Sequence, residues 1–419
     1  MENSLTLKEL GIGNLFKQKE YAKLMSANAI SRFGDSLDAV AYAWMVYILT
    51  GSKILMGALF AVNFIPNILF SFFSGVFADR FSKKRTVVIC DIGRGTVVCI
   101  TAILLSINLL RPWHLFLFTI LNSTFETFSS PARSSMIPSL IPKNLFLTAS
   151  SFSTSVSSFA ELLGAGVAGG VIALLGVSGA ILIDSVTFFI SALLISLIKL
   201  HEGIEDDEKS EKQDYISDFK EGFKFVTSNK LLLVSIFLAA ITNFSFAPLN
   251  VLAPVYVKDI LNYGPEGLSY TGVGLSLGMI LGGLIVSQVG SKFKKSTIIV
   301  TGFSSIGVCY TLLSLPGLVT FFTIKPIYFS IFIFFLIGFF IPLSTAPSQT
   351  YIMENTPKNM LGRVSAFAGM IVLCTIPIGS FLTGIISEYI SIPIIFISMG
   401  TLITGVAVSI LLDKDFRSA

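Results

Sequence analysis

The stretch GVFADRFSKKRTVVICDIGRG, residues 75–95, joins two strongly apolar segments through a short turn that is dense in charge. Its first glycine permits two helices to approach closely, and the acid four residues later can pair with the neighbouring bases or cap the next helix. Basic residues at the end of a membrane span indicate the cytoplasmic side, but they do not explain the spacing from glycine to acid. The residues of this cytoplasmic joint are Gly75, Asp79, Arg80, Lys83, Lys84 and Arg85.

The composition outside this joint is that of a membrane protein. The 419 residues are 53% hydrophobic and 13% charged, with a mean hydropathy of +0.81, whereas soluble domains carry about 25% charged residues. Because a spanning helix needs roughly 20 apolar residues, we expect an all-α fold of twelve transmembrane helices. The predicted spans are 24–49, 54–78, 86–108, 113–134, 148–173 and 177–199, then 231–257, 267–290, 296–316, 326–346, 363–387 and 392–412.

A polar break divides these spans into two sets of six. We predict a six-helix bundle over 1–200, a cytoplasmic linker with a short amphipathic helix over 201–230, and a second six-helix bundle over 231–419. The halves repeat each other, since PARSSMIPSLIPKN at 131–144 is echoed by PSQTYIMENTPKN at 347–359. Parallel repeats of this kind place a substrate site near the bilayer midplane.

The distribution of lysine and arginine predicts the topology. With the N-terminus inside, nearly all bases outside the spans fall on the cytoplasmic side, and the even number of spans returns the C-terminus to that side. We therefore expect both termini in the cytoplasm. The exceptions are Lys53, Arg111, Lys258 and Lys325.

The sequence gives little support for a metalloprotein, an enzyme or a nucleic-acid-binding protein. The four cysteines lie inside apolar segments without ligand spacing, which predicts no metal and no cofactor. His114 and His201 are the only histidines, and no catalytic or nucleotide-binding motif is present, so we expect no enzyme. The net charge of +4 is spread as the topology requires and predicts no nucleic-acid partner.

Ionisable residues inside the first half are the candidate site. In the first span, polar residues recur every three or four positions along one helix face, where Arg32 can partly neutralise Asp35 and Asp38 needs another partner. Charges inside a membrane are costly and usually face a cavity or each other. The expected cavity residues are Arg32, Asp35, Asp38, Glu126 and Glu161.

Two roles remain open for these acids. Asp35, Glu126 and Glu161 lie near the middle of their spans, where a desolvated carboxyl group suits the exchange of protons. Alternatively they pair with Arg32 or Arg133 and hold helices together. The second half carries no such acids within its spans, so coupling chemistry is expected in the first half.

The cytoplasmic joint resembles the loop signature of the major facilitator superfamily, usually written G-x-x-x-D-R-x-G-R-R, with Ser82 in place of the second glycine. The stretches FGDSLDAVAYAWMVYILTGS, SSPARSSMIPSLIP, LIDSVTFFISAL and PKNMLGR resemble the bacterial macrolide-efflux and enterobactin-exporter branch. The resemblance implies that the signature loop holds the outward-open state and that the third and sixth helices are peripheral, so that Asp91, Arg94 and Asp184 stabilise structure or the cytoplasmic gate. We also expect Arg133 and Arg363 to stabilise structure.

The leading functional hypothesis is proton-coupled export of a small amphipathic compound by alternating access, carried out by a monomer in the bacterial cell membrane. Its expected partners are a small-molecule substrate, protons and the lipid bilayer. Uptake or flipping of a nutrient, siderophore or lysolipid is the alternative transport function, and a membrane sensor without transport is a third.

Overall fold

The computed structural model describes residues 15, 18–142, 145–199, 223–289, 294–318, 325–357 and 360–411. Regular structure in these ranges is entirely helical, which confirms the all-α prediction. The helices form two compact units, one from Met1–Thr50 and Val62–Asp206 and the other from Gly51–Ala61 and Asp207–Ala419. Most of the predicted linker 201–230 lies outside the described residues, so the three-part domain division stays a prediction.

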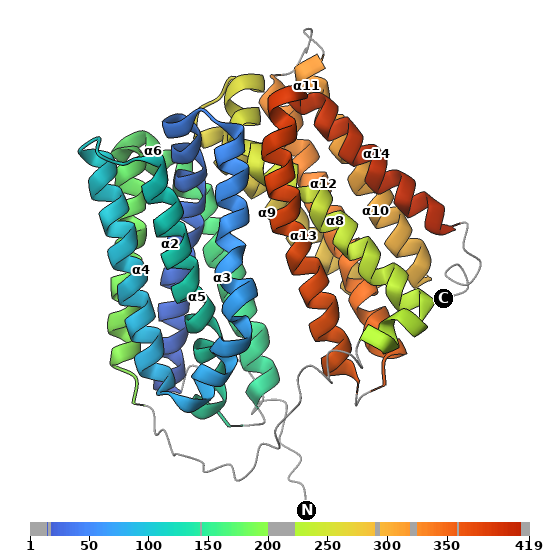
Figure 1. The fold of residues 1–419 in the computed structure, drawn as a ribbon. Coiled ribbons are helices and arrows are strands. Elements are labelled where there is room, and N and C mark those ends of the chain that lie inside the picture. The colour runs from blue at the N-terminus through green and yellow to red at the C-terminus, as the bar shows by residue number, and fades with distance from the viewer. Residues whose placement is uncertain are drawn as a thin grey trace, which may run out of the picture. The chain divides into compact units, whose positions relative to one another are not determined.

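The first unit is built from long helices that pack side by side (Figure 1). They are α2 Lys19–Thr50, the later part of α3 Lys53–Arg80, α4 Lys83–Ser106, α5 Pro112–Leu140 and α6 Phe146–Ser196. Helix α2 packs chiefly on α6, and α4 packs on both α5 and α6. Gly176 interrupts α6 with a φ of 73°, a left-handed conformation that glycine adopts without strain. The break divides α6 into two segments, as the predicted spans 148–173 and 177–199 require.

The second unit contains the remaining helices. They are α8 Lys230–Val255, the π-helical turn η2 Tyr256–Ile260, α9 Glu266–Val289, α10 Lys295–Leu312, α11 Leu315–Leu318, α12 Pro326–Asn355, α13 Leu361–Tyr389 and α14 Ile392–Leu411. The main packed pairs are α9 with α12, α10 with α12 and α14, and α8 with α13. Proline begins α12, where its missing N–H is not needed for a helical hydrogen bond.

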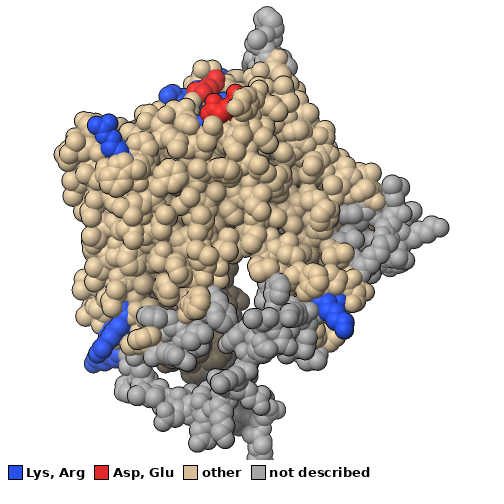
Figure 2. Space-filling view, in the orientation of Figure 1, with Lys and Arg blue, Asp and Glu red and all other residues tan. Residues whose placement is uncertain are grey.

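Nine helices of the described residues are long and apolar enough to cross a membrane. That number counts α6 once, although Gly176 divides it, and it omits α2 and α5, which are long but more polar. On the side seen in Figure 2, the described charged side chains of each unit gather near the ends of its helices, and the surface between is uncharged. An uncharged band with charged ends suits a protein that spans the bilayer.

Glycines permit α9 and α12 to pack backbone against backbone. A Cβ atom at Gly338 would overlap the carbonyl oxygen of Leu275, and one at Gly278 would overlap that of Phe335. In a bilayer the hydrophobic effect does not favour contact between two helices, because lipid tails are equally apolar. Van der Waals packing at such close contacts therefore provides much of the free energy of helix association.

Replacing Gly338 by Ala is expected to lower the stability of the second unit by about 1–3 kcal/mol, because the methyl group forces the two backbones apart. The measurement is the thermal unfolding temperature of the purified protein in detergent. Gly272→Ala is the matched control, since Gly272 also lies in α9 but a Cβ there meets open space. Equal unfolding temperatures for the two variants would contradict the close-packing interpretation.

Candidate functional site

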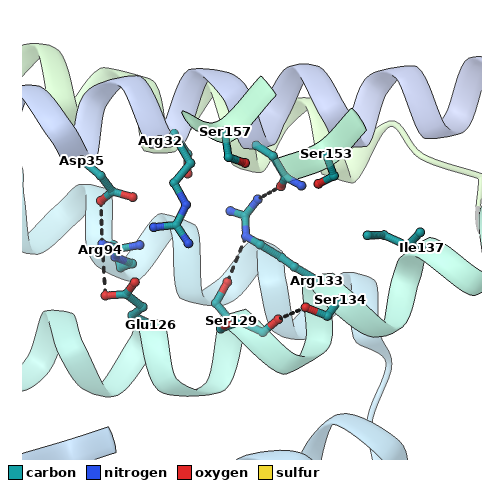
Figure 3. A pocket seen from close by; sticks show the side chains of 13 residues that line it. Arg32, Asp35, Arg94, Glu126, Ser129, Arg133, Ser134, Ile137, Ser153 and Ser157 are labelled. Carbon is teal, nitrogen blue, oxygen red and sulfur yellow. Dashed lines mark hydrogen bonds and ion pairs between the residues drawn. The ribbon is translucent and has the colours of Figure 1, made fainter. Parts of the chain in front are cut away.

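A polar pocket opens within the first unit between α2, α4, α5 and the first part of α6 (Figure 3). Its volume is about 160 Å³, below the roughly 300–1,000 Å³ of sites that enclose a whole drug-sized ligand. The pocket therefore has room for one chemical group of a ligand. Its lining is Asn28, Ser31, Arg32, Asp35, Arg94, Glu126, Ser129, Ser130, Arg133, Ser134, Ile137, Ser153 and Ser157.

Arg94 of α4 is the centre of one ionic cluster in this pocket. Its Nη2 donates to Asp35 Oδ1 at 2.8 Å and lies 3.9 Å from Glu126 Oε2. Its Nε donates to Asn122 Oδ1 at 3.0 Å, and the guanidinium carbon lies 4.2 Å from the centre of the Phe188 ring. The sequence interpretation grouped Arg94 with the cytoplasmic gate, whereas the structure places its side chain in the pocket beside the two predicted cavity acids.

The link between Asp35 and Arg94 also differs from the sequence interpretation, which expected Arg32 to neutralise Asp35 locally. Arg32 and Asp35 share one face of α2, but the guanidinium that reaches Asp35 comes from the neighbouring helix. Helical spacing shows which residues share a face, and packing decides which partner faces them.

Arg133 of α5 anchors a second cluster. Its Nη2 donates to both carboxylate oxygens of Asp91, and its Nη1 donates to Asn28 Oδ1 at 2.7 Å. Asp91 is fully buried and also accepts a hydrogen bond of 2.7 Å from the Ser191 hydroxyl. The sequence offered no signal for Ser191, because it lies 100 residues from Asp91 on a predominantly apolar helix.

Two further acids lie in the interior of this unit without a salt bridge among the described residues. Asp38 Oδ1 is buried and has no hydrogen-bond partner. Asp184 is 1% exposed, accepts a hydrogen bond of 3.2 Å from the Thr187 hydroxyl, and lies against Gly34, where a Cβ atom would overlap its carboxylate. Neither residue lines the pocket. The predicted need of Asp38 for another partner is thus not met by a described cation.

Glu161, the remaining predicted cavity acid, has an exposed side chain outside the pocket lining. Its backbone carbonyl accepts a hydrogen bond of 2.7 Å from the Ser36 hydroxyl, and Gly164 one turn later packs on the backbone of Phe33. These contacts hold the first segment of α6, before Gly176, against α2. The structure therefore brings Arg32, Asp35 and Glu126 together in the pocket lining, whereas Asp38 and Glu161 do not line the pocket.

The cytoplasmic joint is described only in part. The side chains of Asp79, Arg80 and Arg363 and the surroundings of Gly75 lie outside the described part of the structure, so the predicted roles of these residues stay predictions. Ser82, which replaces the glycine of the signature, caps α4 by accepting a hydrogen bond from the backbone of Arg85 at 3.3 Å. Lys84 donates to the carbonyl of Ile198 at 2.8 Å, near the last turn of α6.

Glu20 fixes the same end of α6 from the start of α2. It accepts a hydrogen bond of 2.8 Å from the backbone N–H of Lys199 and one of 3.0 Å from Lys23, which also donates to the carbonyl of Leu197. The backbone N–H of Lys199 and the ammonium of Lys23 hold the pKa of Glu20 below its usual value. The bonds from Lys23 and Lys84 satisfy carbonyl groups at the helix end, where the last carbonyls have no partner within the helix.

A family model described as Major Facilitator Superfamily matches residues 24–372, and the chain belongs to this family. It is therefore a multi-pass membrane protein that transports small molecules, and not an enzyme.

The chain is 23% identical to a macrolide efflux protein A of Streptococcus pyogenes over 96% of this chain and 98% of that protein. It is 22% identical to a staphyloferrin A transporter of Staphylococcus aureus over 90% of this chain and 91% of that protein. The fold matches a variant of the nucleoside transporter NupG with a TM-score of 0.71 at 13% identity, over 96% of this chain and 99% of that one.

Proposed function

We propose that this transporter exports small amphipathic compounds in exchange for protons, with Asp35 and Glu126 as the groups that gain and lose the proton. The observation that carries the proposal is that both carboxylates share Arg94 at the wall of a pocket, at 2.8 and 3.9 Å. A proton added to either acid removes one negative charge from the cluster and weakens its hold on Arg94. The cluster can then alternate between two arrangements. With both acids ionised they hold Arg94, and with one acid protonated that acid releases it.

The rest of the first unit supports this assignment. Glu126 is 45% exposed, so a proton can reach it from the pocket, whereas Arg94 is nearly buried and depends on its acidic partners. Because Arg94 on α4 bonds to Asp35 on α2 and approaches Glu126 on α5, a change in this cluster acts on three helices. Alternating access needs this kind of link between a bound proton and helix positions.

The similarity to the macrolide efflux protein favours export. The similarity to the staphyloferrin A transporter favours a siderophore as an alternative substrate. We place the protein as a monomer in a bacterial cell membrane with both termini in the cytoplasm, because the lysine and arginine distribution favours that orientation. A deletion strain separates the directions of transport. Hypersensitivity to drugs supports export, and failure to grow on one nutrient supports uptake.

Everted membrane vesicles test the proposal. Vesicles that contain the transporter and carry an inward-acidic gradient are expected to accumulate a radiolabelled amphipathic probe, either a macrolide or an aryl carboxylate, and a protonophore should abolish this accumulation. Glu126→Gln is expected to reduce the accumulation severalfold, because one of the two acids at Arg94 can no longer ionise. Glu388→Gln, at an exposed helix end, is the matched control. Accumulation that survives the protonophore would contradict proton coupling.

A further inference from the structure

Arg32 differs from the other two arginines of the pocket in that its guanidinium makes no hydrogen bond or ion pair with a described residue. Arg94 is engaged by Asp35, Asn122 and Glu126, and Arg133 is engaged chiefly by Asp91. The guanidinium of Arg32 makes no hydrogen bond and no ion pair with any described residue, although it lines the same pocket. Figure 3 shows it extending from α2 into the pocket.

A free guanidinium is unusual inside a membrane protein. Its five N–H donors form a planar fork that matches two oxygens of a carboxylate or phosphate, and polar groups withdrawn from bulk water normally have partners. Arg32 lies two helical turns from the cytoplasmic side of the predicted span 24–49, so its side chain has the pocket as its polar surroundings. The guanidinium of Arg32 thus presents its N–H donors to the pocket, and no described residue accepts a hydrogen bond from them.

The acids nearest the pocket are directed to the other two arginines. Asp35 and Glu126 contact Arg94 and Asp91 contacts Arg133, so among the described residues no carboxylate lies within ion-pair distance of Arg32, although Asp35 attracts it from one turn further along α2. The hydroxyl-bearing residues Ser153 and Ser157 line the pocket wall formed by α6. Hydroxyl groups can donate further hydrogen bonds to an anion held by a guanidinium.

We propose that this pocket binds an oxyanion group, a carboxylate or phosphate, of the transported ligand through Arg32. The inference rests on the proposed transport function and adds the chemical class of the ligand. A volume of about 160 Å³ suits the acidic group alone, so the apolar remainder of the ligand lies outside the pocket. The transported compound is then an amphipathic acid, in contrast to a purely cationic drug.

Binding of simple probes to the purified protein tests the inference. Benzoate is expected to raise the thermal unfolding temperature in a saturable way, because a ligand of the native state stabilises it, and its neutral counterpart benzamide is expected to have no effect. Inorganic phosphate distinguishes the two anion classes: an Arg32-dependent shift assigns a general oxyanion site, and a shift with benzoate alone assigns a carboxylate site.

Substitutions at Arg32 locate the binding. Arg32→Gln should weaken benzoate binding at least about tenfold, since hydrogen bonds to charged groups contribute roughly 1.5–3 kcal/mol. Arg32→Lys keeps the positive charge but lacks the planar set of N–H donors. Its affinity for benzoate should lie between those of the wild type and of Arg32→Gln. Arg111→Gln, at the exposed start of α5, is the matched control and should bind as the wild type does.

Two results would overturn the inference: equal shifts with benzoate and benzamide in the wild type, or an unchanged benzoate affinity in Arg32→Gln. The first comparison needs no variant and so does not depend on the folding of one. Because the assay uses no gradient, its failure is distinct from a failure of proton coupling, which only the vesicle experiment detects.

Discussion

Asp35→Asn is expected to lower gradient-driven accumulation in everted vesicles at least about tenfold while the protein remains folded. Asp35 makes the shorter of the two acid contacts to Arg94, at 2.8 Å, and a charge-assisted hydrogen bond contributes roughly 1.5–3 kcal/mol. Each 1.4 kcal/mol corresponds to about a factor of ten. The amide keeps the shape of the side chain but cannot exchange a proton.

The pH dependence separates a coupling role of Asp35 from a purely structural one. If Asp35 carries the proton together with Glu126, the residual transport by Asp35→Asn should respond less steeply to the pH difference than wild-type transport does, whereas substrate binding without a gradient should persist. The exposed-acid variant Glu388→Gln should retain the wild-type pH response. A variant at Asp35 that still follows the pH difference at the wild-type rate would remove this residue from the coupling machinery and leave Glu126 as the remaining candidate.

The spans could be predicted from the sequence because bilayer thickness imposes a length and a composition on each helix. The two helices least like a simple span, α2 and α5, supply most of the polar residues that line the pocket. The predicted break near residues 174–176 also corresponds to the left-handed Gly176. Physical constraints that act along the chain were therefore visible in the sequence.

The ionic partners could not be predicted in the same way. Asp35 meets a guanidinium 59 residues further on, and Arg133 meets an acid 42 residues before it. Helical periodicity placed Asp35 on a polar face, but it favoured Arg32, the nearest base in the sequence, as its partner. Which helix covers a polar face depends on packing such as the close approach of α2 and α6 at Gly34, and no local pattern encodes that contact.

Asp91→Asn is expected to lower the free energy of unfolding by about 3–5 kcal/mol, because it leaves Arg133 in the interior without its carboxylate partner. Asp91 is fully buried and bonded to both Arg133 and Ser191, so the loss affects α4, α5 and α6 together. Thermal or denaturant unfolding of the purified protein measures the change.

A double variant distinguishes this structural role of Asp91 from a role in the cytoplasmic gate, the two roles that the family resemblance implies for it. Asp91→Asn combined with Arg133→Gln removes both charges and should recover most of the lost stability, since neutral replacement of a buried pair costs far less than breaking it. A gate residue would instead leave the stability of the single variant unchanged and alter only the balance of transport states. Arg133 also bonds to Asn28 and Ser129, and all three residues line the pocket, so the loss of Asp91 should disturb the pocket wall as well.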